Sequence, residues 1–352
     1  MHDRLLADFA AGRKAALARA ISIVENHRPG FEQLLATWHP KLGRARRIGL
    51  TGPPGAGKST LTTALTRRYR RAGLTVGIIA VDPTSPFTGG ALLGDRIRME
   101  EVALDPGVYI RSLATRGSLG GLSAATRETA DVLDAFGVDR VLIETVGVGQ
   151  SELDVARTAD TSLVVLVPES GDSIQTLKAG VMEIADVFTV NKADRPGADR
   201  LRNEIEIMLG MRSGATMRNV PAHHGVDLSR NNLVRQVREA ARAEDADSWT
   251  PPVLSTVAAK DQGIDELVEA IDRHFRYLER SGMLRERRRA RLRERVVEVV
   301  EDKTRRRLWS DEATNAWLEE RLPALEAGLA TPFGIADALL SRSADLLTRT
   351  TT

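Results

Sequence analysis

The stretch "GPPGAGKST" at residues 52–60 decides the fold class of this chain. It fits the pattern G-x-x-x-x-G-K-[ST], with Gly52, Gly57, Lys58 and Ser59 at the fixed positions. The preceding "RRIGLT" is typical of a short buried strand, and the following "LTTALTRRYRRAG" is typical of a helix. Because this motif requires a strand before it and a helix after it, we predict a phosphate-binding loop.

The residues of this loop have separate expected roles. Glycines allow backbone N–H groups to turn toward an oxyanion, and the helix N-terminus adds partial positive charge. We expect Lys58 to reach the β- and γ-phosphates of a nucleotide and the Ser59 hydroxyl to bind Mg²⁺. The predicted nucleotide-binding residues here are Gly52, Pro54, Gly55, Ala56, Gly57, Lys58, Ser59 and Thr60.

The composition limits the class of protein. The chain has 352 residues, a formal net charge of +2 and no cysteine, which excludes disulfides, thiolate metal sites and iron–sulfur ligation. No apolar run approaches the ~20 residues of a membrane span, and the first residues lack the apolar core of a secretory signal. We therefore expect a cytoplasmic protein that binds neither membrane nor nucleic acid.

The chain divides into three regions by pattern. Residues 1–45 show helical spacing of apolar residues, residues 46–278 alternate strands with helices, and residues 279–352 have no strand signal. Alternation of this kind predicts an α/β fold with a mostly parallel, doubly wound sheet, flanked by helical N- and C-terminal extensions. The predicted strands are "RIGLT", "VGIIAVD", "VYIRSL", "RVLIETV", "TSLVVLVP", "DVFTVNK" and "PVLSTV".

One segment, residues 210–232, lacks periodicity and is rich in turn-forming residues. We expect a long surface loop there. It contains His223 and His224, but no carboxylate or thiol stands near them at a fixed ligand spacing, so we interpret them as solvated loop histidines.

Two predicted strands end in acidic residues. Asp82 ends "VGIIAVD", and Glu144 lies in "RVLIETVGVGQSE", followed at the E-x-x-G interval by Gly147. In P-loop enzymes, acids at the ends of neighbouring strands handle Mg²⁺ and water, and a backbone N–H at such a glycine senses the γ-phosphate. The two acidic strand ends therefore support a nucleotide-hydrolysing site.

The stretch "FTVNKAD" indicates which nucleobase the site binds. Asn191, Lys192 and Asp194 form N-K-x-D at the end of a strand. An aspartate carboxylate can accept hydrogen bonds from the adjacent N1–H and N2–H₂ of guanine, whereas adenine presents an acceptor at N1. We therefore predict GTP and GDP as ligands, with the Ala258 backbone N–H in "PVLSTVAAKDQG" as the candidate donor to guanine O6.

With these motifs in this order, the chain resembles the MeaB/ArgK group of P-loop GTPases, which includes the methylmalonic aciduria type A proteins. The resemblance covers nearly the whole chain and rests on "GPPGAGKST", "AVDPTSPFTGGALLGDRIRM", "GGLSAATRETADVLDAFG", "LIETVGVGQSE", "GDSIQTLKAG", "VNKAD" and "TPFGIADALL". It implies a GTPase chaperone that gates cofactor loading, protection or reactivation of an adenosylcobalamin-dependent acyl-CoA mutase. It also implies a homodimer formed through C-terminal helices.

The resemblance assigns further site residues. Asp82, Asp95 and Glu144 would organise Mg²⁺ and the hydrolytic water together with Ser59. Residues 168–180 match a switch that contacts the mutase, in which Lys178 could order the loop across the nucleotide. The chain departs from many relatives at Ala179, at Val257 with Ala258, and in the longer 210–232 segment.

Hydrolysis by the chain alone is expected to be slow and to be stimulated by the partner. No arginine finger or general base stands out in the sequence, and Gln150 is the candidate for orienting water. The alternatives are a GTPase for metal insertion into another metalloenzyme, a small-molecule kinase, and a scaffold that binds GTP without hydrolysing it. For residues 285–307 we favour an amphipathic helix over a nucleic-acid-binding one, because acids interleave with its arginines and Leu292, Val296, Val299 and Val300 form an apolar stripe.

Overall fold

A computed structural model describes residues 3–82, 99–114, 124–145, 155, 157–169, 183–212, 234–235, 237–240 and 248–342. The chain divides into two compact units, Met1–Leu284 and Arg285–Thr352. The helices before the first strand belong to the same unit as the sheet. The domain boundaries at residues 45 and 278 remain predictions.

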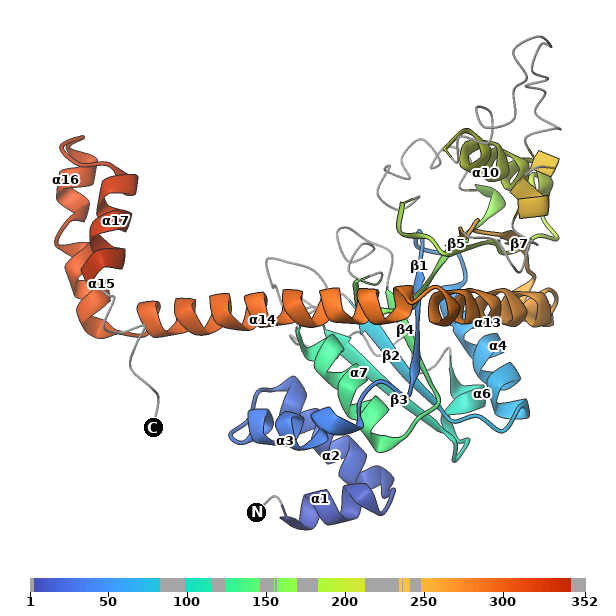
Figure 1. Ribbon diagram of the computed structural model, residues 1–352, viewed down its shortest axis with the longest axis horizontal. Helices are drawn as coiled ribbons and strands as arrows, with labels where there is room; N and C mark the ends of the chain where they lie inside the picture. The colour runs from blue at the N-terminus through green and yellow to red at the C-terminus, as the bar shows by residue number, and fades with distance from the viewer. Residues whose placement is uncertain are drawn as a thin grey trace, which may run out of the picture. The chain divides into compact units, whose positions relative to one another are not determined.

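A seven-stranded sheet with the order β3-β2-β4-β1-β5-β6-β7 forms the centre of the first unit (Figure 1). Every strand pairing is parallel, so the predicted mostly parallel sheet is confirmed, as are all seven predicted strands. The strands are β1 (Arg46–Thr51), β2 (Val76–Asp82), β3 (Val108–Ala114), β4 (Arg140–Thr145), β5 (Thr161–Leu166), β6 (Val187–Val190) and β7 (Val253–Ser255).

The strand order places the phosphate loop at a reversal of the chain path. From β1 the chain runs to one side of the sheet for β2, β3 and β4, and to the other side for β5, β6 and β7. In open parallel sheets, ligands bind at such a reversal, outside the carboxyl ends of the strands. The loop that follows β1 leaves the sheet at this point.

Helices cover both faces of the sheet (Figure 1). One apolar cluster joins the sheet to α4 and α13, and α6 packs against α4; a second joins it to α1, α2, α3 and α7; a third joins β5, β6 and β7 to α10. Among the described residues of this unit, the helices are α1 (Asp3–Ala10), α2 (Lys14–Glu25), α3 (Phe31–Trp38), α4 (Lys58–Arg71), α6 (Glu100–Ala103), α7 (Ala124–Phe136), α10 (Ala198–Arg212) and α13 (Ile264–Arg280), with 3₁₀ turns η1 (His39–Lys41) and η3 (Ala258–Lys260).

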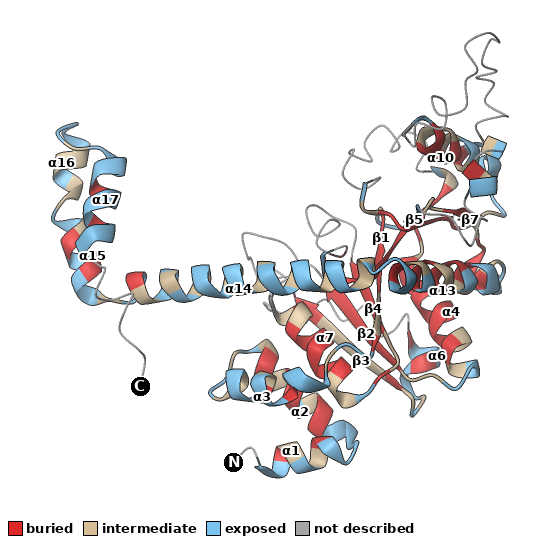
Figure 2. Cartoon of the chain, viewed as in Figure 1, coloured by how far each residue is buried: buried red, intermediate tan, exposed pale blue. Residues whose placement is uncertain are grey.

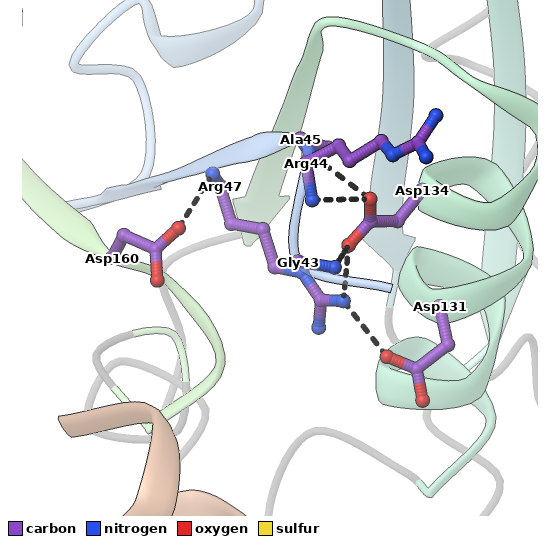
Figure 3. Close-up of polar contacts among 7 residues, drawn as sticks. All are labelled: Gly43, Arg44, Ala45, Arg47, Asp131, Asp134 and Asp160. Carbon is purple, nitrogen blue, oxygen red and sulfur yellow. Dashed lines mark hydrogen bonds and ion pairs between the residues drawn. The ribbon is translucent and has the colours of Figure 1, made fainter. Parts of the chain in front are cut away.

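The linker between the N-terminal helices and β1 is fixed by one buried carboxylate (Figure 3). Asp134 of α7 accepts three consecutive backbone N–H bonds at 2.8, 3.1 and 2.9 Å, from Gly43, Arg44 and Ala45. Arg47 extends the cluster by binding Asp131 at 2.8 Å and Asp134 at 3.3 Å. Since a buried charge requires partners, this cluster attaches the start of β1 firmly to α7.

The described residues of the second unit, 285–342, form helices joined by short turns. The helices are α14 (Met283–Trp309), whose first two residues belong to the first unit, α15 (Glu312–Glu319), α16 (Leu322–Glu326) and α17 (Pro332–Arg342). Leu308, Trp317, Ile335 and Leu339 form its small core, while Asp311 caps α15 by accepting the Thr314 N–H at 2.8 Å. Most of α14 is exposed or half-buried (Figure 2).

The loop predicted over residues 210–232 was wrong at its start, because α10 continues to Arg212; its remaining residues, including both histidines, lie outside the described part. No helix in the described residues is long and apolar enough to cross a membrane.

Candidate nucleotide site

The loop between β1 and α4 has a conformation that only glycine can adopt at its first position. Gly52 has φ of 137°, and a Cβ atom there would lie 2.1 Å from the backbone oxygen of Val165 in β5. Pro54, Gly55 and Thr60 are exposed, whereas Ala56, Lys58 and Ser59 are buried. The loop therefore packs closely against the neighbouring strand and leaves its turn open to solvent.

Lys58 is the first residue of α4 and is buried. Its ammonium donates to the carbonyl oxygens of Gly52 at 2.8 Å and Pro53 at 3.0 Å. These carbonyls offset part of the desolvation of the charge. The Lys58 ammonium therefore lies inside the loop, beside the N-terminus of α4. The positive charge of the ammonium and the partial positive charge of the helix N-terminus both favour a bound phosphate.

The carboxylate of Glu144, in β4, faces helix α4. Glu144 pairs with Leu50 of β1, and because side chains alternate along a strand it shares a sheet face with Leu142, which packs in the cluster containing Leu61 of α4. Ser59 Oγ donates to Glu144 Oε1 at 2.5 Å, and Thr62 Oγ1 donates to Glu144 Oε2 at 2.9 Å. The structure thus brings together two of the four predicted Mg²⁺ residues, Ser59 and Glu144.

The donor set fits Mg²⁺, which prefers hydroxyl, carboxylate and water oxygens. Ser59 and Glu144 supply such oxygens from the described residues. Asp82 ends β2, but its side chain and all of Asp95 lie outside the described part. Within that part no group of three or more His, Asp or Glu side chains forms a metal cluster, so the roles of Asp82 and Asp95 remain predictions.

Asn191, just after β6, joins three segments of the site. Its Nδ2 donates to the Ala56 carbonyl at 2.9 Å. Its Oδ1 accepts from the Ala258 N–H at 3.1 Å and from Thr256 Oγ1 at 3.2 Å. This buried amide therefore fixes the N-K-x-D loop to the phosphate loop on one side and to the segment after β7 on the other.

The two charged residues of N-K-x-D contact other parts of the site. Lys192, with a left-handed φ of 56°, donates from Nζ to the Gly55 carbonyl at 2.8 Å. Asp194 is exposed and accepts from Lys260 Nζ at 2.8 Å. This hydrogen bond lowers the pKa of Asp194 below its usual value. A carboxylate that remains ionised suits the recognition of two guanine N–H donors.

The remaining predicted residues are Ala258, Gly147, Gln150 and Lys178. Ala258 begins η3, and its N–H donates to Asn191, so its contact with guanine O6 remains a prediction. Gly147, Gln150 and Lys178 lie outside the described residues, as does the 168–180 segment beyond residue 169.

Sequence reasoning missed Thr62 and Lys260. Thr62 follows Ser59 by three residues, which places both on one face of α4, and this spacing was the available signal. Lys260 stands in the segment after β7, but its approach to Asp194 depends on how two separate loops fold.

The comparisons with known proteins agree with this geometry. Residues 17–313 match the family described as Methylmalonyl Co-A mutase-associated GTPase MeaB. The chain belongs to the MeaB family of GTPases. It is a P-loop GTPase, and membership implies that it binds GTP and GDP.

Relatives cover most of this MeaB-family chain. A protein of Pyrococcus abyssi whose name describes it as a GTPase is 47% identical to this chain over 300 residues, which cover 85% of this chain and 84% of that protein. The mouse methylmalonic aciduria type A homolog, mitochondrial, is 31% identical, covering 96% of this chain and 78% of that protein. The solved structure of a LAO/AO transport system kinase has a TM-score of 0.65 at 27% identity and covers 98% of this chain and 97% of that one.

Proposed function

We propose that this GTPase is a cytoplasmic chaperone of an adenosylcobalamin-dependent acyl-CoA mutase, methylmalonyl-CoA mutase or a close relative. In this role it gates loading of the cofactor, or protection or reactivation of the mutase. The observation that carries the proposal is the family match over residues 17–313, which extends from α2 through the sheet to α15. The description of that family names an association with methylmalonyl-CoA mutase.

The residues of the site support a nucleotide-dependent timing role. Lys58 and the N–H groups of the phosphate loop bind the β- and γ-phosphates, and Asp194 with Asn191 holds the guanine. Ser59 and Glu144, with Asp82 and Asp95, would hold Mg²⁺, which neutralises charge on the phosphates when bound. Asn191 links the base loop to the phosphate loop directly, so the two ends of the nucleotide bind to one connected framework.

We propose that residues 168–180 contact the mutase. We propose that Gly147 senses the γ-phosphate, that Gln150 orients water, and that Lys178 in residues 168–180 completes the site when the mutase is bound. Hydrolysis is then slow in the chain alone and faster in the complex.

The second unit supports a homodimer. Leu292, Val296, Val299 and Val300 of α14 are exposed by 50%, 63%, 43% and 57%, although their spacing puts them on one face of the helix. An exposed apolar surface of this kind marks an interaction site. We propose that a second copy of the chain covers this stripe.

The test is GTP hydrolysis by the purified chain, alone and with each candidate mutase, with ATP as the control nucleotide. A rate that rises several-fold with one mutase supports the proposal and identifies the partner. Lys58→Ala is the matched variant, because it should abolish nucleotide binding and, with it, protection of the mutase.

Other outcomes would favour the alternatives. No stimulation by any mutase, with stimulation by the apo-form of another metalloenzyme, would indicate a metal-insertion GTPase. Turnover of ATP equal to that of GTP would contradict the guanine assignment. It would favour a small-molecule kinase, the activity by which the structurally similar LAO/AO transport system kinase is named.

A further inference from the structure

The carboxylate of Glu144 is held by two hydroxyl groups of one helix. Ser59 binds Oε1 at 2.5 Å and Thr62 binds Oε2 at 2.9 Å. Glu144 is 5% exposed and Thr62 is fully buried. A buried carboxylate oxygen without a donor is unfavourable, so Thr62 provides a hydrogen bond that water cannot readily replace.

Binding both oxygens fixes more than the position of the carboxylate. One hydrogen bond leaves the group able to rotate about its terminal torsion, which has a broad energy minimum. A second hydrogen bond, on the other oxygen, also fixes the plane of the group. The plane decides the direction in which Oε1 accepts the Ser59 proton.

The orientation of the Ser59 hydroxyl follows from this contact. A hydroxyl has one proton to donate and two lone pairs that can accept or ligate. While the proton points to Glu144, the lone pairs remain available on the other side of the oxygen. A serine hydroxyl that binds Mg²⁺ must present a lone pair to the metal.

We propose that Thr62 is a positioning residue of the Mg²⁺–nucleotide site. It fixes the plane of the Glu144 carboxylate, and through it the direction of the Ser59 hydroxyl, without touching nucleotide or metal itself. This inference rests on the proposed roles of Ser59 and Glu144 toward Mg²⁺. Groups that orient a metal ligand through one hydrogen bond commonly change metal affinity by about 10- to 100-fold when removed.

The same helix offers a matched control one turn further on. Thr66 is also fully buried, but its Oγ1 donates to the backbone oxygen of Thr62 at 2.7 Å. Thr66→Val therefore removes a buried hydroxyl from α4 without changing the donors to Glu144. Any effect common to Thr62→Val and Thr66→Val is an effect on the helix alone.

The experiment measures the affinity of a fluorescent GDP analogue across a Mg²⁺ titration and in EDTA, for the full-length protein and the variants Thr62→Val, Thr62→Ser and Thr66→Val. Thermal unfolding of each variant verifies the fold. We expect Thr62→Val to raise the Mg²⁺ concentration for half-maximal tightening about 10-fold, with affinity in EDTA unchanged. Thr62→Ser restores the parent curve, and Thr66→Val matches it.

Two results would overturn the inference. Equal Mg²⁺ curves for Thr62→Val and Thr66→Val would show that the Thr62 hydroxyl does not orient the site. The same conclusion would follow if Thr62→Val lowered the affinity for the GDP analogue equally with Mg²⁺ and in EDTA. If the affinity of the parent protein for the GDP analogue does not depend on Mg²⁺, the proposed metal roles of Ser59 and Glu144 are contradicted instead. The mutase proposal is tested separately, because this measurement contains no mutase.

Discussion

The Lys260 ammonium lies 2.8 Å from Oδ2 of Asp194, and the two side chains come from loops after different strands. The hydrogen bond from Lys260, aided by the positive charge of Lys260 and Arg195, lowers the pKa of Asp194. The carboxylate that is expected to recognise guanine thus has a cationic partner within the chain. Its contribution to nucleotide binding is present above its pKa and is lost as the pH falls through it.

Lys260→Met should therefore move the acid limit of GDP binding to higher pH. Removing the ammonium takes away the main cause of the lowered pKa, so Asp194 becomes protonated earlier as the solution is acidified. The measurement is the GDP dissociation constant between about pH 2.5 and 6, a range that includes the ordinary aspartate pKa of about 3.9 and lower values. Lys41→Met, at an exposed lysine of η1, is the control; an unchanged acid limit in Lys260→Met would show that the pair does not influence the base site.

Asp194→Asn should exchange guanine for xanthine as the preferred base. The amide keeps one acceptor for N1–H and replaces the other with an NH₂ donor, which repels the 2-amino group and matches the 2-carbonyl of xanthine. We expect GDP affinity to fall at least about 100-fold, because the 2-amino group of guanine loses its acceptor and faces a donor instead. Competition between GDP and XDP measures the change, with Asp199→Asn in α10 as the control.

Gly52→Ala and Gly55→Ala should have very different effects. Both glycines have positive φ, 137° and 76°, but an added Cβ at Gly55 meets no atom within 4 Å, whereas at Gly52 it meets the Val165 oxygen at 2.1 Å. Gly55→Ala should lower the free energy of unfolding by about 1 kcal/mol, the strain of a left-handed residue. Gly52→Ala should lower it by more than about 3 kcal/mol, as measured by urea unfolding; similar losses would show that β5 yields to the added atom.

The sequence predicted those parts of the site that lie in continuous motifs. The phosphate loop needs only a strand, glycines and a helix in order, so its local pattern was sufficient. All seven strands could be recognised because buried parallel strands are short β-branched runs between turns and helices. The extent of α10 was misjudged because a Gly-Met-Arg sequence at a helix end resembles a loop.

The contacts across the sheet could not be predicted in the same way. Thr62 and Glu144 are separated by 82 positions, and they meet only because β4 lies beside β1 in the sheet. Strand order is a tertiary property that no local pattern contains. The same reason explains why the hydrogen bonds between Asp134 and the linker before β1 were not predicted. Asp134 and Ala45 are separated by 89 positions.

Val296→Glu in α14 should convert a dimer into a monomer. Val296 is 63% exposed within the apolar stripe, and a carboxylate placed in a surface covered by a second copy would be desolvated without a partner. Helix propensity changes little, since glutamate is a good helix former. Sedimentation or light scattering at fixed protein concentration measures the mass, and circular dichroism verifies that the helices remain.

The control for this prediction is Glu301→Gln, an exposed position on the side of α14 away from the stripe. It removes a charge from the same helix without altering the apolar surface, so the mass should stay that of the parent protein. If Val296→Glu remains dimeric while the parent is dimeric, the second copy binds elsewhere on the chain. A monomeric parent would contradict the dimer and leave the stripe available to a different partner, for which the mutase complexes of the hydrolysis experiment provide the next test.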